Sequence, residues 1–147
     1  MKERSHENES CKDGVRYLNV AENEKICSEG SYGTEMYVII DGKVKISLRR
    51  KGEDFELTTL EAGEFFGEMC LLEDEPRSAD AIAVEPTTLM VIDKISFNKV
   101  AQKNPSLIFK IMKTLSCRLR ESNERLLEYK HEFESQLGDI LDKNREE

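Results

Sequence analysis

The segment Met36-Tyr-Val-Ile-Ile-Asp-Gly-Lys-Val-Lys-Ile-Ser-Leu48 contains two β-rich runs on either side of an Asp-Gly pair. In the second run Val44, Ile46 and Leu48 alternate with polar residues, which is typical of a strand with one buried face and one wet face. An Asp-Gly pair between two such runs is a strong signal for a tight β-hairpin. We therefore expect two neighbouring, paired strands around Asp41-Gly42.

Short β segments continue on both sides of this expected hairpin. From Val15 to Ile92 they are separated by turn residues, for example at Gly52 and Gly63. Many short antiparallel strands at this spacing predict a β-sandwich or a jelly-roll barrel. We expect a mainly β fold with added helices. Its body is an antiparallel jelly roll (a double-stranded β-helix) over residues 14–103, preceded by a disordered arm over residues 1–13.

The hydrophobic period changes after these strands. Asp93 is placed to cap a short helix, and Asn104-Pro105 offers an N-cap and a first helical residue for another. No proline interrupts the chain from there to Lys143, and Gly138 is the single glycine. We expect a long helix over residues 104–143, which spans roughly 60 Å at 1.5 Å per residue, and a tail over residues 144–147.

The long helix carries a repeat with alternate spacings of four and three residues, as in a coiled coil. One heptad position holds Leu119, Leu126, Phe133 and Ile140, and the other holds Leu115, Ser122, Tyr129 and Gln136. Packing on the chain's own barrel accounts for the first turns, Leu107 to Leu115. Beyond them we expect a parallel coiled-coil homodimer, with Ser122 as a polar break in its seam.

Charge and composition narrow the function classes. The 147 residues carry 22 Lys and Arg against 30 Asp and Glu, a net charge of −8, which argues against nucleic acid as a partner. No apolar run approaches the roughly 20 residues of a membrane span, and the start has no secretory signal. The four cysteines form no CxxC pair, which argues against a disulfide framework or a zinc site. We expect a cytoplasmic protein without DNA or membrane contacts.

The loop Phe66–Ala79 gathers groups that suit a small nucleotide. Gly67 can adopt a positive φ, and the residues after it can form a helical turn whose N–H groups favour an anion. Arg77 offers a bidentate fork for phosphate oxygens, and Ser78 adds a hydroxyl. Glu68 suits a donor, such as a ribose 2′-hydroxyl. The alternative is an ion pair between Glu68 and Arg77 that only braces the loop.

From about Leu18 to Tyr129 the sequence resembles the cyclic-nucleotide-binding domains, in particular those of bacterial catabolite activators. The motifs in the family's order are Glu29-Gly30, Asp41-Gly42-Lys43-Val44, Gly63-Glu64-Phe65-Phe66-Gly67-Glu68 and Pro76-Arg77-Ser78-Ala79. The resemblance implies a regulatory domain, not an enzyme, that binds cyclic AMP ahead of cyclic GMP, needs no cofactor and has a dimer helix. We expect the signal to pass through this helix to an unlinked protein effector. The helix-turn-helix domain of the activators is not expected in this chain.

The resemblance also implies a role for each site residue. The sugar and phosphate contacts are Gly67, Glu68, Met69, Arg77 and Ser78. The contacts to the base are Ile46, Leu57 and Thr58, with Ser122 and Asn123 reaching the base amino group from the dimer helix.

Two other functions are compatible with parts of this pattern. A dimerisation or docking module that keeps the fold without a ligand is one. A metal-dependent cupin-like enzyme is the other, but it needs His ligands on the barrel, whereas His6 and His131 lie in the arm and on the late helix.

Overall fold

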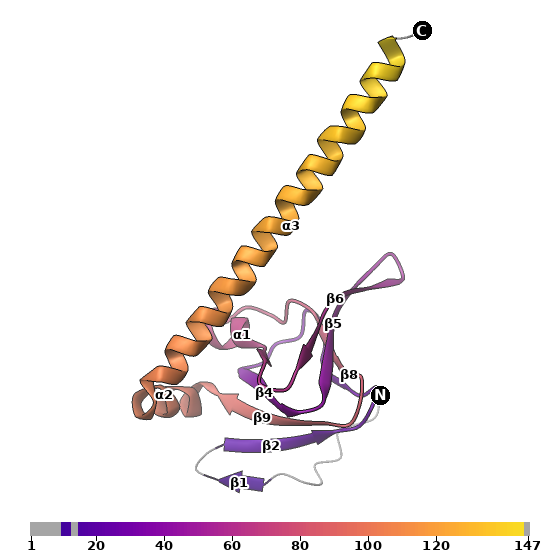
Figure 1. The fold of residues 1–147 in the computed structure, drawn as a ribbon. Helices are drawn as coiled ribbons and strands as arrows, with labels where there is room; N and C mark the ends of the chain where they lie inside the picture. The colour runs from indigo at the N-terminus through magenta and orange to yellow at the C-terminus, as the bar shows by residue number, and fades with distance from the viewer. Residues whose placement is uncertain (1–9, 13–14, 146–147) are drawn as a thin grey trace. The chain divides into compact units, whose positions relative to one another are not determined.

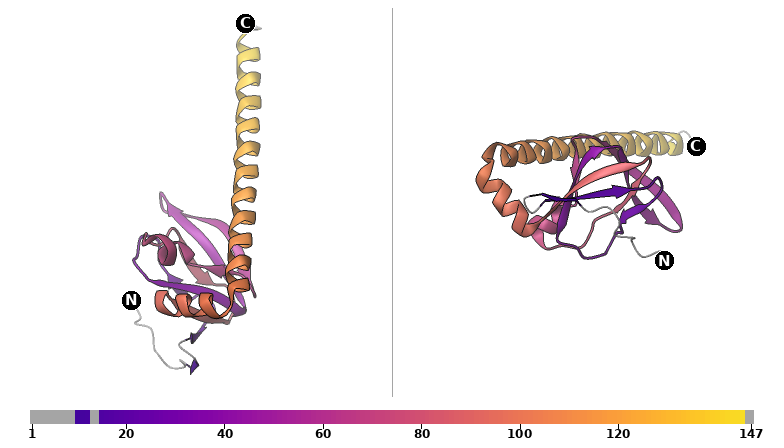
Figure 2. Two further views of the ribbon diagram at one scale, coloured as in Figure 1. Left: turned by 90° about the vertical axis from the view of Figure 1, so that its left-hand side faces the viewer. Right: turned by 90° about the horizontal axis from the view of Figure 1, so that it is seen from below.

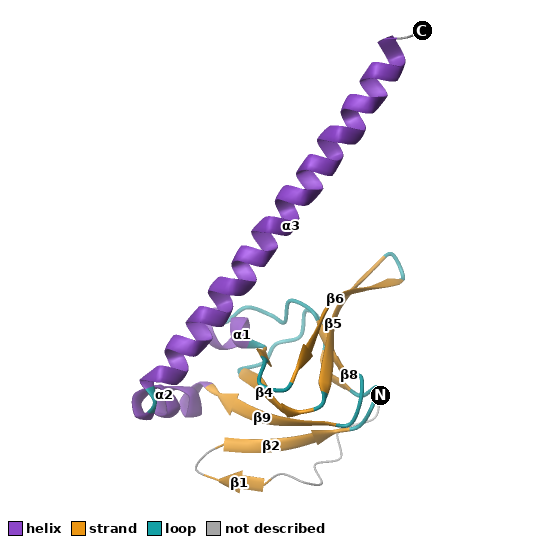
Figure 3. Cartoon of the chain, viewed as in Figure 1, coloured by secondary structure: helices purple, strands orange, loops and turns teal. Residues whose placement is uncertain are grey.

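The computed structural model describes residues 10–12 and 15–145, which form nine strands and three helices (Figures 1 and 3). The chain divides into two compact units, Met1–Val100 and Ala101–Glu147. The strands all belong to the first unit, and most of the second unit is one helix. None of the described helices is both long enough and apolar enough to cross a membrane.

The first unit contains the strands and one short helix before its final helical segment. In chain order these elements are β1 (Ser10–Lys12), β2 (Val15–Val20), β3 (Lys25–Cys27), β4 (Glu35–Asp41), β5 (Lys43–Arg50), β6 (Glu53–Glu61), β7 (Phe65–Phe66), α1 (Glu68–Glu73), β8 (Asp80–Ala83) and β9 (Thr87–Asp93).

The strands form two antiparallel sheets around one apolar core. One sheet has the order β1-β2-β9-β4-β7, and the other has the order β3-β8-β5-β6. The core residues come from both sheets: Val20, Ile26, Tyr37, Ile39, Val44, Leu60, Phe66, Ala81, Ala83, Leu89 and Val91. The expected fold class, an antiparallel jelly roll followed by helices, is confirmed.

The hairpin expected around Asp41-Gly42 is wrong. Strand β4 pairs with β7 and β9, whereas β5 pairs with β6 and β8, so the chain passes from one sheet to the other at this turn. Gly42 has a φ of 102°. The backbone of Lys43 bonds to Val84 and Thr87 instead of to β4. Ile39 on β4 and Val44 on β5 are both fully buried, one in each sheet. The sharp turn between them therefore takes the chain from one sheet to the other across the core.

A true hairpin joins β5 and β6. Lys51 and Gly52 have φ values of 53° and 80°, and Arg50 pairs with Glu53 as the last rung. Two central residues with positive φ are the mark of a type I′ turn, whose twist matches that of the strands. The expected turn at Gly52 is therefore confirmed (Figure 3).

The N-terminal stretch differs in part from expectation. Within the predicted disordered arm, Ser10–Lys12 form β1, which pairs with β2 along the edge of the first sheet (Figure 1). An edge strand offers unpaired backbone N–H and C=O groups. The backbone of a polar segment can pair with them, so this strand needs no apolar pattern. The remainder of the predicted arm lies outside the described residues.

The two later helices begin where their caps predict. Asp93 accepts the N–H of Ser96 at 2.7 Å at the start of α2 (Lys94–Lys103), and this hydrogen bond lowers the pKa of Asp93. Helix α3 (Pro105–Arg145) begins directly after Asn104 and ends two residues beyond the predicted Lys143. Gly138 lies within α3, and Figure 2 shows α3 as one continuous helix.

Candidate functional site

The candidate site centres on the turn from β7 into α1. Gly67 has φ 82° and ψ 8°, a left-handed conformation, and is the N-cap of α1 without any side-chain cap. Glycine adopts this conformation without strain, and the turn leaves the first N–H groups of α1 without a capping side chain. Cys70 and Leu71 are buried and anchor the short helix to the core.

Arg77 lies in the segment between α1 and β8, and its side chain is buried, with 6% of the residue exposed. Its Nη1 donates to the carbonyl oxygens of Glu35 at 2.8 Å and Gly67 at 3.4 Å. The guanidinium lies over the ring of Tyr37, 5.4 Å from the centroid. These contacts come from backbone carbonyls and an aromatic face, so none of them neutralises the charge.

The rest of the guanidinium has spare donors. In the part of the chain that the structure describes, Nε and Nη2 of Arg77 have no hydrogen-bond partner, and Arg77 forms no ion pair, with Glu68 or any other carboxylate. Every fully buried side-chain nitrogen or oxygen among these residues has a partner, so Nε and Nη2 keep some contact with solvent. Three N–H groups of a buried cation are therefore available to an anion.

Two glycines make room for this guanidinium. A Cβ added to Gly33 would lie 2.5 Å from Nη2 of Arg77, and one added to Gly67 would lie 2.5 Å from Nη1. Because real Cβ atoms do not approach so closely, any other residue at either position would displace the head of Arg77. The close approach of the backbone on both sides fixes where the cation lies.

The loop of residues 28–33, between β3 and β4, holds the backbone of Arg77. Gly30 donates its N–H to the carbonyl oxygen of Arg77 at 2.8 Å, and Arg77 donates its own N–H to the carbonyl oxygen of Ser31 at 2.8 Å. The side chain and the main chain of Arg77 are thus positioned by the same loop.

Tyr37 and Glu35 are supported from the other side. The ring of Tyr37 stacks on Phe66 with centroids 5.0 Å apart. The carboxylate of Glu35 accepts Arg16 at 2.9 Å and the hydroxyl of Tyr37 at 3.4 Å. Residues of β2, β4 and β7 therefore support the ring and the backbone that Arg77 contacts.

The other predicted phosphate and sugar contacts lie near this centre in the chain. Glu68 is the half-buried first residue of α1, Met69 follows it and is exposed, and Ser78 is exposed directly after Arg77. The structure brings the backbone of Gly67 and the guanidinium of Arg77 into contact, as the sequence pattern requires.

The predicted base contacts lie on the β5–β6 hairpin. Half-buried Ile46 pairs with exposed Thr58, and the register shifts immediately afterwards, so that Ser47 pairs with Glu56. Leu57 is the extra residue of this bulge and is exposed. Ser122 and Asn123 are exposed on α3 in the second unit, and their contact with a ligand stays a prediction.

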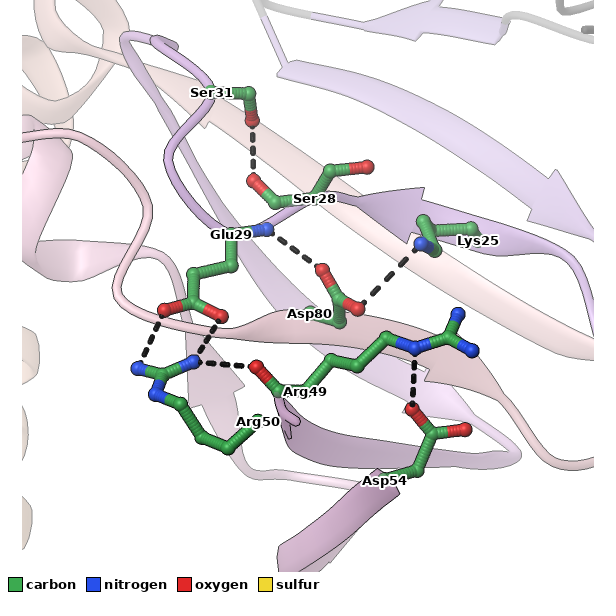
Figure 4. A network of polar contacts seen from close by, with 8 residues as sticks. All are labelled: Lys25, Ser28, Glu29, Ser31, Arg49, Arg50, Asp54 and Asp80. Carbon is green, nitrogen blue, oxygen red and sulfur yellow. Dashed lines mark hydrogen bonds and ion pairs between the residues drawn. The ribbon is translucent and has the colours of Figure 1, made fainter. Parts of the chain in front are cut away.

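A polar network joins the end of this hairpin to the loop of residues 28–33 (Figure 4). Arg50 donates through both terminal nitrogens to the carboxylate of Glu29, at 2.9 Å and 2.8 Å. The N–H of Glu29 donates to Asp80 at 2.7 Å, and Lys25 contacts the other oxygen of Asp80 at 3.4 Å.

The sequence pattern missed Gly33, Glu35 and Tyr37 as parts of the site. Glu35 acts through its backbone carbonyl, which no side-chain pattern reveals. Gly33 has no positive φ, so no turn signal marks it. Its role is to let Arg77, 44 positions later in the chain, approach the backbone closely. In the described residues no three His, Cys, Asp or Glu side chains are grouped as metal ligands, and His131 lies on α3.

Comparison with known proteins gives a consistent result. A model of the cyclic nucleotide-binding domain matches residues 17–104. The cGMP-dependent protein kinase of Plasmodium berghei is 33% identical over 124 residues, which are 84% of this chain and 13% of the kinase. The cyclic AMP receptor protein of Thermus thermophilus is 32% identical over 106 residues, 71% of this chain and 49% of that protein.

The fold agrees with a solved relative. The crystal structure of the Thermus thermophilus catabolite activator protein matches with a TM-score of 0.70 at 30% identity, over 76% of this chain and 53% of that chain. This chain spans at most about half the length of the curated relatives named above. On these findings, and on the buried arginine cradled by two glycines, the chain belongs to the cyclic nucleotide-binding domain family.

Proposed function

We propose that this chain is a regulatory sensor that binds a 3′,5′-cyclic nucleotide, cyclic AMP ahead of cyclic GMP, and signals through a homodimer of α3. The observation that carries the proposal is the guanidinium of Arg77, which is buried and whose Nε and Nη2 have no hydrogen-bond partner among the described residues. Burying a cation without an anion is costly. A cyclic phosphate supplies the anion, and two of its oxygens fit a guanidinium fork.

The groups around Arg77 divide between phosphate and sugar. The Ser78 hydroxyl and the N–H groups of Gly67, Glu68 and Met69 are further donors for phosphate oxygens. The carboxylate of Glu68 repels an anion, so its role is to accept a hydrogen bond from the ribose 2′-hydroxyl. A ligand with both a phosphate and a free 2′-hydroxyl satisfies the whole set.

The base lies against the β5–β6 hairpin in this proposal. Ile46, Leu57 and Thr58 offer an apolar surface with one hydroxyl, which suits the face of a purine. They do not choose between adenine and guanine, and Asn123 can both donate and accept. Relatives named for cyclic AMP and for cGMP match about equally well. The preference for cyclic AMP rests on the similarity of residues 104–124 to the dimer helix of the catabolite activators.

The dimer is proposed from the exposed apolar side chains of α3. Leu119, Leu126, Phe133 and Ile140 are more than half exposed and recur at seven-residue intervals. The described part of the second unit is α3 and the end of α2, so none of its other described residues forms an element that could cover them. A parallel coiled coil with a second copy would bury this stripe.

Signalling then follows from contacts on the dimer helix. A ligand shifts a conformational equilibrium only through different contacts with the two states. Ser122 and Asn123 are the candidates, because they would touch the base from α3, and an unlinked effector would detect the change in the helices. Coupling between ligand and dimer is reciprocal, so cyclic AMP should alter dimer dissociation.

Calorimetry of the purified chain with cyclic AMP, cyclic GMP and 5′-AMP tests the ligand. We expect binding of cyclic AMP, weaker binding of cyclic GMP, and little binding of 5′-AMP, whose phosphate is not closed into a ring with the 3′-oxygen of the ribose. A chain that binds neither cyclic nucleotide contradicts the proposal.

Sedimentation with and without cyclic AMP tests the dimer. The substitutions Leu126→Lys and Phe133→Lys place charge in the seam and should give monomers. A variant that stays dimeric places the interface elsewhere. Two results together would contradict signalling through α3. They are dimer dissociation that does not change with cyclic AMP, and an unchanged affinity for cyclic AMP in Ser122→Ala/Asn123→Ala; α3 would then only link the two copies.

A further inference from the structure

We propose that the ion pair between Arg50 and Glu29 positions the β5–β6 hairpin against the loop that holds Arg77, and so tunes the affinity for ligands that contact both. The inference rests on the proposed function, because it concerns the base side and the phosphate side of the same ligand. Arg50 is a positioning residue and does not itself contact the nucleotide.

The geometry of this pair is well defined for a surface contact. Both terminal nitrogens of Arg50 meet the two carboxylate oxygens of Glu29, at 2.9 Å and 2.8 Å (Figure 4). A bidentate contact of this kind fixes orientation as well as distance. The hydrogen bond lowers the pKa of Glu29 and raises that of Arg50, so both groups stay charged at neutral pH.

One side of the pair is fixed to the phosphate centre. The N–H of Glu29 is held by Asp80 at the start of β8, at 2.7 Å. The next two residues, Gly30 and Ser31, bond to the backbone of Arg77 at 2.8 Å each. The carboxylate of Glu29 therefore extends from a loop that is joined to Arg77 by two short hydrogen bonds and to Asp80 by a third.

The other side of the pair lies at the least supported part of the hairpin. Strand β5 pairs with β8 from Val44 to Ser47, whereas Leu48, Arg49 and Arg50 pair with β6 alone. The bulge at Leu57 lies where the third strand ends. Two-stranded ribbons are marginally stable and more strongly twisted than larger sheets. The ion pair at Arg50 therefore restrains this end of the hairpin.

The consequence for binding concerns a ligand that spans both sides. Among the predicted base contacts, Ile46 pairs with both β8 and Thr58, whereas Leu57 lies at the bulge where the two-stranded part of the hairpin begins. The tie at Arg50 therefore concerns the base contact at Leu57 most directly, while Arg77 is held by the loop of residues 28–33. A hairpin already held in place costs less ordering on binding. A ligand that contacts Arg77 and lacks a base gains nothing from the tie.

This difference gives a direct test with two ligands. Calorimetry compares cyclic AMP with ribose 3′,5′-cyclic phosphate, which has no base, on the wild type, Glu29→Gln and Arg50→Gln. We expect each variant to bind cyclic AMP about two- to fivefold more weakly, the range for one exposed ion pair, and to bind the base-free ligand as the wild type does. The swap Glu29→Arg/Arg50→Glu should restore the ratio of the two affinities.

Arg49→Gln is the matched control. It removes the same charge from the neighbouring residue, whose contact with Asp54 at 3.8 Å lies within the hairpin itself. This variant should leave both affinities unchanged. If Arg50→Gln is poorly folded, as thermal melting would show, Arg50→Lys keeps the charge, loses the bidentate contact and serves in the same comparison.

Three outcomes would overturn the inference. The first is unchanged affinity for cyclic AMP in both single variants, and the second is an equal loss for both ligands, which would mean that the pair only supports the loop. The third is a swap, Glu29→Arg/Arg50→Glu, that does not restore the ratio of the two affinities. A wild type that binds neither ligand instead removes the proposed function itself, and with it this inference.

Discussion

Arg50 and Arg77 both contact the loop of residues 28–33, but their charges are treated in opposite ways. Arg50 is more than half exposed, and its fork is filled by the carboxylate of Glu29. Arg77 is buried, and its partners are two carbonyl oxygens and an aromatic ring. Within residues 10–12 and 15–145, the arginine that water could solvate is neutralised, and the buried one has no anionic partner.

The difference distinguishes an arginine whose charge is paired within the chain from one that we propose binds a ligand. A filled fork has little left to offer a ligand, and an exposed pair adds little to stability. A buried cation without an anion is a cost that only a partner outside the chain can offset. The position of the spare donors, more than the number of arginines, is therefore what supports the proposed site at Arg77.

The largest expected effect comes from removing Arg77, with the removal of Arg50 as the comparison. Arg77→Ala should cost about 2–5 kcal/mol of binding to cyclic AMP, the range for truncating one partner of a desolvated charge pair. Arg50→Ala should weaken binding by no more than about fivefold. Calorimetry of both variants measures the contrast. Similar losses in the two would break the distinction drawn above.

The next prediction concerns Glu68 and the sugar of the ligand. If its carboxylate accepts the ribose 2′-hydroxyl, 2′-deoxy cyclic AMP should bind more weakly by about 1–3 kcal/mol, because a partly buried acceptor loses its donor. Glu68→Gln should reduce this preference, whereas Glu73→Gln, on the same short helix, should keep it. Equal affinities of the wild type for the two ligands would assign Glu68 another role.

Gly33 tests how tightly the position of Arg77 is set. In Gly33→Ala the new Cβ would lie 2.5 Å from Nη2, so the flexible guanidinium must shift. We expect affinity for cyclic AMP to fall about tenfold, roughly 1.4 kcal/mol, with the fold retained. The neighbouring exposed Thr34→Ala should bind normally. Unchanged affinity in Gly33→Ala would show that the fork tolerates displacement.

The smallest expected effect is the pH dependence of the Arg50 contact. Because the folded-state pKa of Glu29 is lowered by Arg50, its stabilising contribution is fully present above the unfolded value of 4.5. It is lost as the pH falls below this value and through the folded-state pKa. Denaturation of the wild type and Glu29→Gln from pH 7 to pH 3 should show a small difference that disappears in acid. A difference that grows in acid would contradict the sign.

Two turns with the same kind of local signal show what the sequence could predict of the fold. Asp41-Gly42 and Lys51-Gly52 both mark sharp turns between strands, and the strands themselves lie where alternation placed them. The second turn closes a hairpin, whereas the first is a corner between sheets. A positive φ is a local property, but strand pairing depends on partners elsewhere, here Val84 and Thr87 beside Lys43.

The site shows the same division. Gly67 and Arg77 could be chosen from spacing, since a glycine before a short helix and an arginine soon after it are features of one segment. The backbone carbonyl of Glu35 and the close approach of Gly33 lie on segments 42 and 44 residues away from Arg77. No local pattern joins them to it.

By itself the sequence determined most strand and helix positions, the start of α3 and the left-handed turn at Gly67, because periodicity, capping and φ preferences act over a few residues. The tertiary structure decided which strands pair, that Ser10–Lys12 add an edge strand, and that Arg77 is buried against carbonyls while Arg50 meets Glu29. Burial and charge pairing depend on distant segments packing together, and that information appears only once the two sheets enclose their core.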